Sequence, residues 1–80
     1  MDRTETQARV KKVIVKVLHA SEDSITDNAN FIFDLGADSA QSLELVAGFQ
    51  EEFNIKMDED KALSIQTVAD AVNFIQGYLK

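Results

Sequence analysis

The sequence contains no cysteine, no proline and no tryptophan, and it has only three glycines and one histidine among 80 residues. The lack of cysteine excludes a disulfide framework and a thiolate metal site, and it fits a reducing, cytoplasmic compartment. The lack of proline and the scarcity of glycine favour helices with short connections. No run of about 18 apolar residues occurs, and the N-terminus has no apolar signal segment. We therefore expect neither membrane insertion nor secretion.

Acidic side chains outnumber basic ones by 14 to 8, and they are concentrated in the middle of the chain. Residues 1–20 carry five basic and two acidic side chains, whereas residues 21–60 carry eleven acidic side chains and one basic one, Lys56. A nucleic-acid-binding protein needs a basic surface to neutralise phosphates, so nucleic acid is not expected as a partner. A basic protein partner fits this charge, but so does an acidic surface that only keeps a monomer soluble.

Apolar periodicity predicts an all-α fold in a single domain over residues 1–80. Helices are expected over residues 5–18 and 39–53, with a short helical turn over residues 58–64 and a last helix that starts after Thr67. These elements make a small bundle of three main helices and one short helix, with a long loop between the first two.

Several local features sharpen this expectation. The pattern "TETQ" predicts a capping box between Thr4 and Gln7 at the first helix start. Leu43 is assigned to the apolar stripe of the second helix, and Leu63 is expected to face inward beside Ala62. Gly48 lies in the middle of the second predicted helix, where glycine lowers helix stability by roughly 1 kcal/mol relative to alanine. We therefore expect either that another segment packs closely on it or that space is kept open there.

The connection over residues 20–37 is long and polar. Connections beyond about 12–15 residues without regular structure are uncommon and are usually functional. Gly36 is expected to take a positive φ or to lie close to another backbone segment. Five apolar side chains are expected to hold this loop on the core, namely Ile25, Phe31, Ile32, Phe33 and Leu35.

Ser39 follows this loop, beside Asp38 and directly before an apolar-periodic segment. A catalytic serine needs a base within hydrogen-bond reach, but the only histidine, His19, lies at the end of another predicted helix. The spacing of a G-x-S-x-G nucleophile elbow is also missing. Independent catalysis is therefore not expected. Two interpretations of Ser39 remain. It is either an N-cap or a modified residue at a helix start, where a phosphate group is favoured.

The acidic run over residues 58–61, "DEDK", is the other candidate for chemistry. It lacks the alternating acids, central glycine and terminal glutamate of an EF-hand loop. Acidic residues in a first helical turn complement the helix dipole, so we expect a helix start here and no dedicated metal site.

The chain resembles the acyl carrier proteins over nearly its whole length, most specifically in "DLGADS" at residues 34–39, followed by "LELV" and "EEF". In that family the motif's serine carries 4′-phosphopantetheine, which a magnesium-dependent phosphopantetheinyl transferase installs from coenzyme A. The resemblance implies that Ser39 is the attachment point of an arm that holds acyl groups as thioesters. It implies a non-catalytic carrier in fatty-acid or related biosynthesis, serving acyl-loading, condensing and acyl-transfer enzymes.

The resemblance also implies that the second helix and the motif dock on basic patches of partner enzymes. The residues at the matching positions are Asp34, Asp38, Ala40, Glu44, Glu51 and Glu52. Ala40 stands where the family usually has leucine, and Gln41 where it often has an acidic residue. These departures suggest a specialised carrier with a restricted set of partners.

An apolar lining between the second and last helices is a candidate acyl cavity, formed by Leu45, Val46, Phe49, Phe53, Ile65, Val68 and Val72. The same residues would form the core of any such bundle, so a cavity and a filled core both remain open. Two other functions also remain open. One is a polyketide, amino-acyl or D-alanyl carrier, and the other is an unmodified acidic protein-interaction module.

Overall fold

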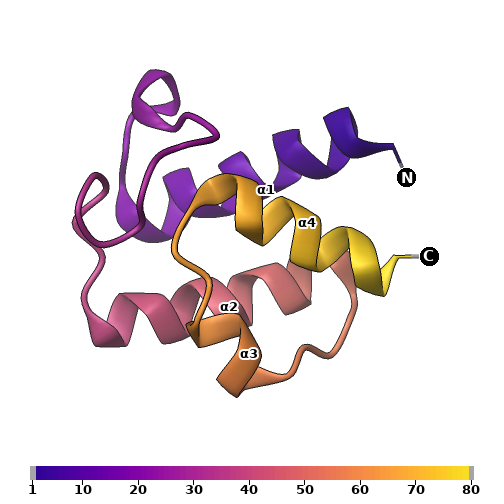
Figure 1. Ribbon diagram of the computed structural model, residues 1–80. Coiled ribbons are helices and arrows are strands. Elements are labelled where there is room, and N and C mark those ends of the chain that lie inside the picture. Colours follow the sequence, from indigo (N-terminus) through magenta and orange to yellow (C-terminus); the bar gives the residue numbers. More distant parts are fainter. Residues whose placement is uncertain (1, 80) are drawn as a thin grey trace.

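A computed structural model describes residues 2–79 of the chain as an α-helical bundle (Figure 1). The elements are α1 (Arg3–Leu18), the 3-10 turn η1 (Glu22–Ser24), α2 (Ser39–Phe53), α3 (Glu59–Leu63) and α4 (Val68–Tyr78). The described range contains no β-strand, which confirms the all-α prediction. None of these helices is long and apolar enough to cross a membrane.

Each α-helix begins after a side chain that accepts a hydrogen bond from a backbone N–H of the first turn. Asp38, Asp58 and Thr67 cap α2, α3 and α4, which confirms the predicted starts of these helices. The predicted capping box at Thr4 is wrong, because Asp2 caps α1 by accepting from the N–H of Glu5 at 2.8 Å. Thr4 therefore lies inside α1.

The core lies where α1 packs against both α2 and α4. Its most deeply buried side chains are Val10, Ile14, Ile25, Val68, Val72 and Ile75. Ala62 is buried as predicted, but the inward positions predicted for Leu43 and Leu63 are wrong, since these side chains are 50% and 45% exposed. Leu63 is the last residue of a five-residue helix, so it lies at the edge of the core.

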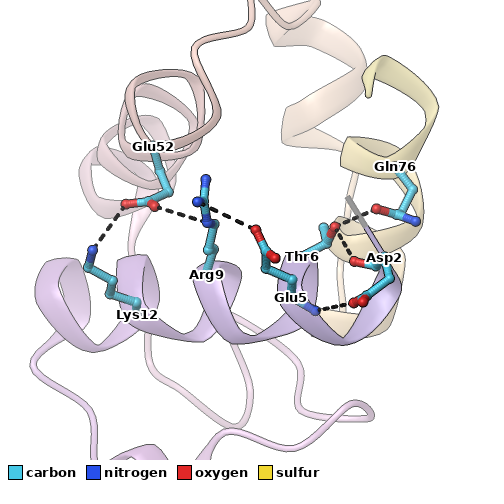
Figure 2. A network of polar contacts seen from close by, with 7 residues as sticks. All are labelled: Asp2, Glu5, Thr6, Arg9, Lys12, Glu52 and Gln76. Atoms are coloured by element: carbon cyan, nitrogen blue, oxygen red, sulfur yellow. Dashed lines mark hydrogen bonds and ion pairs between the residues drawn. The ribbon is translucent and has the colours of Figure 1, made fainter. Parts of the chain in front are cut away.

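One buried hydroxyl links the first and last helices. Thr6 is fully buried, and it is the only buried polar side chain among residues 2–79. Its hydroxyl hydrogen-bonds with the backbone carbonyl of Asp2 at 3.0 Å and with the side chain of Gln76 in α4 (Figure 2). This polar group is therefore satisfied in the core.

At Gly48, α2 comes close to α1. A Cβ atom added at Gly48 would lie 2.8 Å from Cγ1 of Val13 and 3.7 Å from Cγ2 of Val17. Real Cβ contacts are not this short, so the absence of a side chain is what lets the two helices approach. Of the two alternatives expected at Gly48, close packing is the one that the structure shows.

The loop between α1 and α2 is held against the start of α4 by backbone hydrogen bonds. The N–H of Phe31 donates to the carbonyl of Gln66 at 2.9 Å, and the N–H of Val68 donates to the carbonyl of Ala29 at 3.1 Å. Gly36 adopts a φ of 73°, as predicted. Residues 30–37 are therefore fixed relative to the bundle, although they contain no regular helix.

The prediction that five apolar side chains anchor this loop is confirmed for only part of the set. Ile25 and Phe31 are buried, and Leu35 packs partly against the core. The prediction is wrong for Ile32 and Phe33, which are 60% and 88% exposed. The physical reason is a local turn, in which the Asn30 side-chain oxygen accepts hydrogen bonds from the N–H groups of both residues at 2.9 Å.

Candidate functional site

The start of α2 is shaped by a reciprocal pair of hydrogen bonds around Ser39. Asp38 Oδ1 accepts from the backbone N–H of Gln41 at 2.8 Å, and Gln41 Oε1 accepts from the backbone N–H of Asp38 at 3.2 Å. This is a capping box. Asp38 is thus the N-cap, and Ser39 is the first residue of the helix. The alternative that Ser39 serves as the N-cap is wrong.

The Ser39 side chain is exposed, and its hydroxyl makes no hydrogen bond to any residue between 2 and 79. First-turn N–H groups lack intrahelical partners, and the backbone N–H groups of Ser39 and Ala40 belong to this turn. They lie at the positive end of a 15-residue helix, where a phosphate is favoured. The residues present therefore fit a phosphate-bearing group on the Ser39 oxygen.

The acidic residues proposed for docking fall into two classes. Asp34, Asp38, Glu44 and Glu51 are exposed, as is Ala40. Asp34 Oδ2 accepts from the backbone N–H of Asn30 at 2.7 Å, and Asp38 caps α2, so these two carboxylates also stabilise the backbone. Glu44 and Glu51 form no ion pair within residues 2–79, so their carboxylates remain available to a partner.

Glu52 has a different environment from the other acidic residues (Figure 2). Its carboxylate lies 3.8 Å from Nε of Arg9 and 3.6 Å from Nζ of Lys12, and its side chain is only 20% exposed. Arg9 also pairs with Glu5 at 3.5 Å. Glu52 therefore connects α2 to α1. Its position four residues after Gly48 is a sequence signal for this, because residues four apart share one side of a helix.

A cavity of about 290 Å³ opens beside the start of α2. Four of the predicted acyl-cavity residues line it, namely Leu45, Val46, Phe49 and Ile65. Phe53, Val68 and Val72 are buried in the core but are not among its lining residues. Sequence reasoning missed the walls contributed by Met57, Ala62, Leu63 and Ala71.

The loop before α2 also contributes to this cavity, through Asn30, Phe31, Ile32 and Phe33. The apolar residues within an otherwise polar loop were the sequence signal for this wall. Ser42 lines the cavity as well, and it lies three residues after Ser39 on α2. Residues three apart are neighbours on a helix surface, so the cavity lies about one helical turn from the Ser39 hydroxyl.

The short helix α3, which provides another wall, is held in place by its flanking residues. The backbone N–H of Asp58 donates to the hydroxyl of Tyr78 in α4 at 3.1 Å. The backbone N–H of Met57 donates to Oε1 of Gln50 in α2 at 2.9 Å. Because α3 is tied to both α2 and α4, the cavity has defined walls on each side.

Comparison with known proteins finds the same features in one family. The sequence model of the family described as "Phosphopantetheine attachment site" matches residues 8–75, a range that contains Ser39 and all of α2. An acyl carrier protein from Phenylobacterium zucineum (strain HLK1) is 52% identical over 68 residues, which covers 85% of this chain and 86% of that protein. The solved structure of a provisionally assigned acyl carrier protein from Mycobacterium tuberculosis superposes with a TM-score of 0.84 at 26% identity. The matched region covers 91% of this chain and 97% of the M. tuberculosis chain.

Proposed function

Because the chain belongs to the acyl carrier proteins of the phosphopantetheine-attachment family, we propose that Ser39 bears the 4′-phosphopantetheine arm. The family is one of non-catalytic carriers, so the reactions on the cargo are carried out by other enzymes. The observation that supports Ser39 is its exposed hydroxyl at the first position of α2, within the matched range. When attached, the arm supplies a terminal thiol that holds an acyl group as a thioester.

The chain's own contribution at this point is to present and orient one hydroxyl. The capping box of Asp38 and Gln41 fixes the first turn of α2 without using the Ser39 oxygen. The N–H groups of Ser39 and Ala40 point out of the helix start, where they stabilise a phosphate by an amount typically of 0.3–1 kcal/mol at an exposed site. An enzyme can therefore reach the hydroxyl without disturbing the helix cap.

The partners we propose are a phosphopantetheinyl transferase and the enzymes that load, condense and transfer acyl groups. Glu44 and Glu51 are seven residues apart, so they lie on the same outer side of α2, where both are exposed. Exposed charges raise the rate of encounter with a basic partner more than they extend the lifetime of the complex. This suits a carrier that visits several enzymes. Fatty-acid or related biosynthesis is the pathway class, and a polyketide, amino-acyl or D-alanyl carrier is the alternative.

The direct test is incubation of the purified chain with a phosphopantetheinyl transferase, magnesium and coenzyme A, followed by intact-mass measurement. We expect one phosphopantetheine to be added per chain, and fragmentation should place it within α2. The same protein incubated without the transferase is the control. An unchanged mass with several transferases would contradict the carrier function and favour the unmodified acidic interaction module.

We also propose that the cavity receives the acyl chain of the loaded form. Its wall is mainly apolar, and it lies about one helical turn from Ser39. Its volume of about 290 Å³ is roughly twice that of an engineered apolar cavity of about 150 Å³ that binds benzene. A chain of medium length is therefore expected to fit, and a long one is expected to extend beyond the walls.

This cavity proposal predicts where NMR signals move when the arm is acylated. The methyl groups of Val46 and Ile65 should shift between the unloaded and loaded forms, because both residues line the cavity. Val68 is buried but does not line the cavity, so its shifts serve as the internal control. Changes confined to Ser39 and its neighbours at residues 36–40 would contradict an enclosed acyl chain.

A further inference from the structure

Three of the residues that line this cavity have exposed apolar side chains. Phe33 is 88% exposed, Ile32 is 60% exposed and Leu63 is 45% exposed, and all three line the same cavity. Single exposed apolar residues are ordinary on protein surfaces. A group that lines one cavity is different, because contiguous apolar surface is typical of a binding site.

Phe33 is held outward by a hydrogen-bonded turn. The Asn30 side-chain oxygen accepts from the backbone N–H groups of Ile32 and Phe33, and the backbone N–H of Asn30 donates to the Asp34 carboxylate. The Gly36 N–H closes the turn by donating to the Ile32 carbonyl at 3.1 Å. The turn as a whole is fixed to the bundle by the Phe31–Gln66 hydrogen bond. An aromatic side chain on a fixed backbone loses little conformational entropy when a partner covers it.

We propose that Phe33 is an apolar anchor for the phosphopantetheinyl transferase that modifies Ser39, an inference that rests on the proposed function. Phe33 and Ser42 line one cavity, and Ser42 is one helical turn from Ser39, so an enzyme that reaches Ser39 approaches this turn. Asp34, the next residue after Phe33, is exposed, and so is Glu44 on α2. The complementary surface is therefore an apolar pocket rimmed by lysine or arginine.

The small side chain of Ala40, directly after Ser39, makes an apolar contact from Phe33 more important. Ala40 is exposed and offers a single methyl group next to Ser39, so in the first turn of α2 the residue beside the attachment point provides little apolar area. The nearest large apolar side chain on this helix is Leu43, which is 50% exposed. Aromatic residues dominate the energetic centres of protein interfaces, whereas surrounding polar contacts contribute less. Phe33 thus supplies an aromatic contact that Ala40 does not, and the exposed acids supply orientation.

The test measures kcat/KM of a phosphopantetheinyl transferase for the unmodified chain, with coenzyme A and magnesium. Phe33→Ala should lower kcat/KM by about ten- to thirtyfold, mainly through KM, while Phe33→Leu should retain most of it. Phe33→Glu should also lower it, although it adds an acidic charge. Val15→Ala on α1 removes apolar volume away from the cavity wall and should leave kcat/KM unchanged. The Phe33→Ala loss should persist at high salt, where interactions between exposed charges are screened.

The outcomes separate this proposal from the proposed function. If the wild-type chain is modified and Phe33→Ala is modified equally fast, the anchor is overturned and the carrier function stands. Faster modification of Phe33→Glu would overturn it in favour of recognition by charge alone. Equal modification of Phe33→Ala with faster hydrolysis of its loaded thioester would also overturn it, because Phe33 would then cover the cargo. A wild-type chain that no transferase modifies would overturn both.

Discussion

Replacement of Ser39 by alanine is expected to abolish the addition of phosphopantetheine completely, while leaving the fold intact. The attached group bonds to the hydroxyl oxygen, and alanine has no oxygen to offer. The fold should tolerate the change because this hydroxyl makes no hydrogen bond within residues 2–79, and Asp38 caps the helix. Intact-mass measurement after transferase treatment reports the modification, and far-UV circular dichroism reports the helix content.

Ser42 provides the matched control for this substitution. It is the next serine along α2 and lies about one helical turn from Ser39, within the cavity wall. Ser42→Ala should therefore gain one phosphopantetheine, as the wild type does. If Ser39→Ala still gained the group and Ser42→Ala did not, the attachment point would be Ser42. If both variants gained it, a hydroxyl outside this helix would be the acceptor.

The boundaries of α2 were predictable because strong local signals coincide there. An aspartate N-cap, a glutamine three residues later and an apolar period beginning at once all favour the same start, and the helix runs over residues 39–53 as predicted. The start of α1 was less determined. Asp2 and Thr4 are both acceptable caps, and the structure adds a contact near this start that local patterns do not reveal, between Thr6 and Gln76, which is 70 residues away in sequence.

The cavity and its rim were less predictable from sequence, because they depend on pairing between distant segments. The periodicity of α2 and α4 identifies apolar faces, but it does not separate a side chain that lines a cavity, such as Val46, from one that fills the core, such as Val72. The exposure of Phe33 depends on the hydrogen bonds that the Asn30 side-chain oxygen accepts from the backbone N–H groups of Ile32 and Phe33, and on the pairing of the loop with Gln66. Sequence alone predicts an apolar residue there to be buried.

The attachment point and the packing of the bundle are linked through α2. One side of this helix meets α1 at Gly48 and through the ion pairs of Glu52. A second side forms the cavity wall through Leu45, Val46 and Phe49. Glu44 and Glu51 lie on the outer side. Any change that moves α2 away from α1 should therefore alter the cavity and the docking surface together.

Gly48→Ala is expected to destabilise the protein, in spite of the better helix propensity of alanine. The new Cβ atom would lie 2.8 Å from Cγ1 of Val13, and this methyl group belongs to a buried, β-branched side chain with little rotamer freedom. Overpacking of this kind costs about 1–3 kcal/mol, whereas the gain in helix propensity returns up to about 1 kcal/mol. Denaturant unfolding should therefore show a net loss of about 1 kcal/mol in the free energy of unfolding.

Two further variants isolate the contact between the helices. Gly77→Ala introduces the same change in α4 at a position with no atom within 4 Å of the new Cβ, so the stability should be unchanged or raised by up to about 1 kcal/mol. Val13→Ala removes the obstructing methyl groups. In combination with Gly48→Ala it should cost less than the sum of the two single losses, because residues in direct contact are coupled. Additive losses would show that the destabilisation does not arise at the contact with Val13. A Gly48→Ala variant as stable as wild type would show that α1 and α2 move apart at little cost. In that case the cavity would not depend on their close approach.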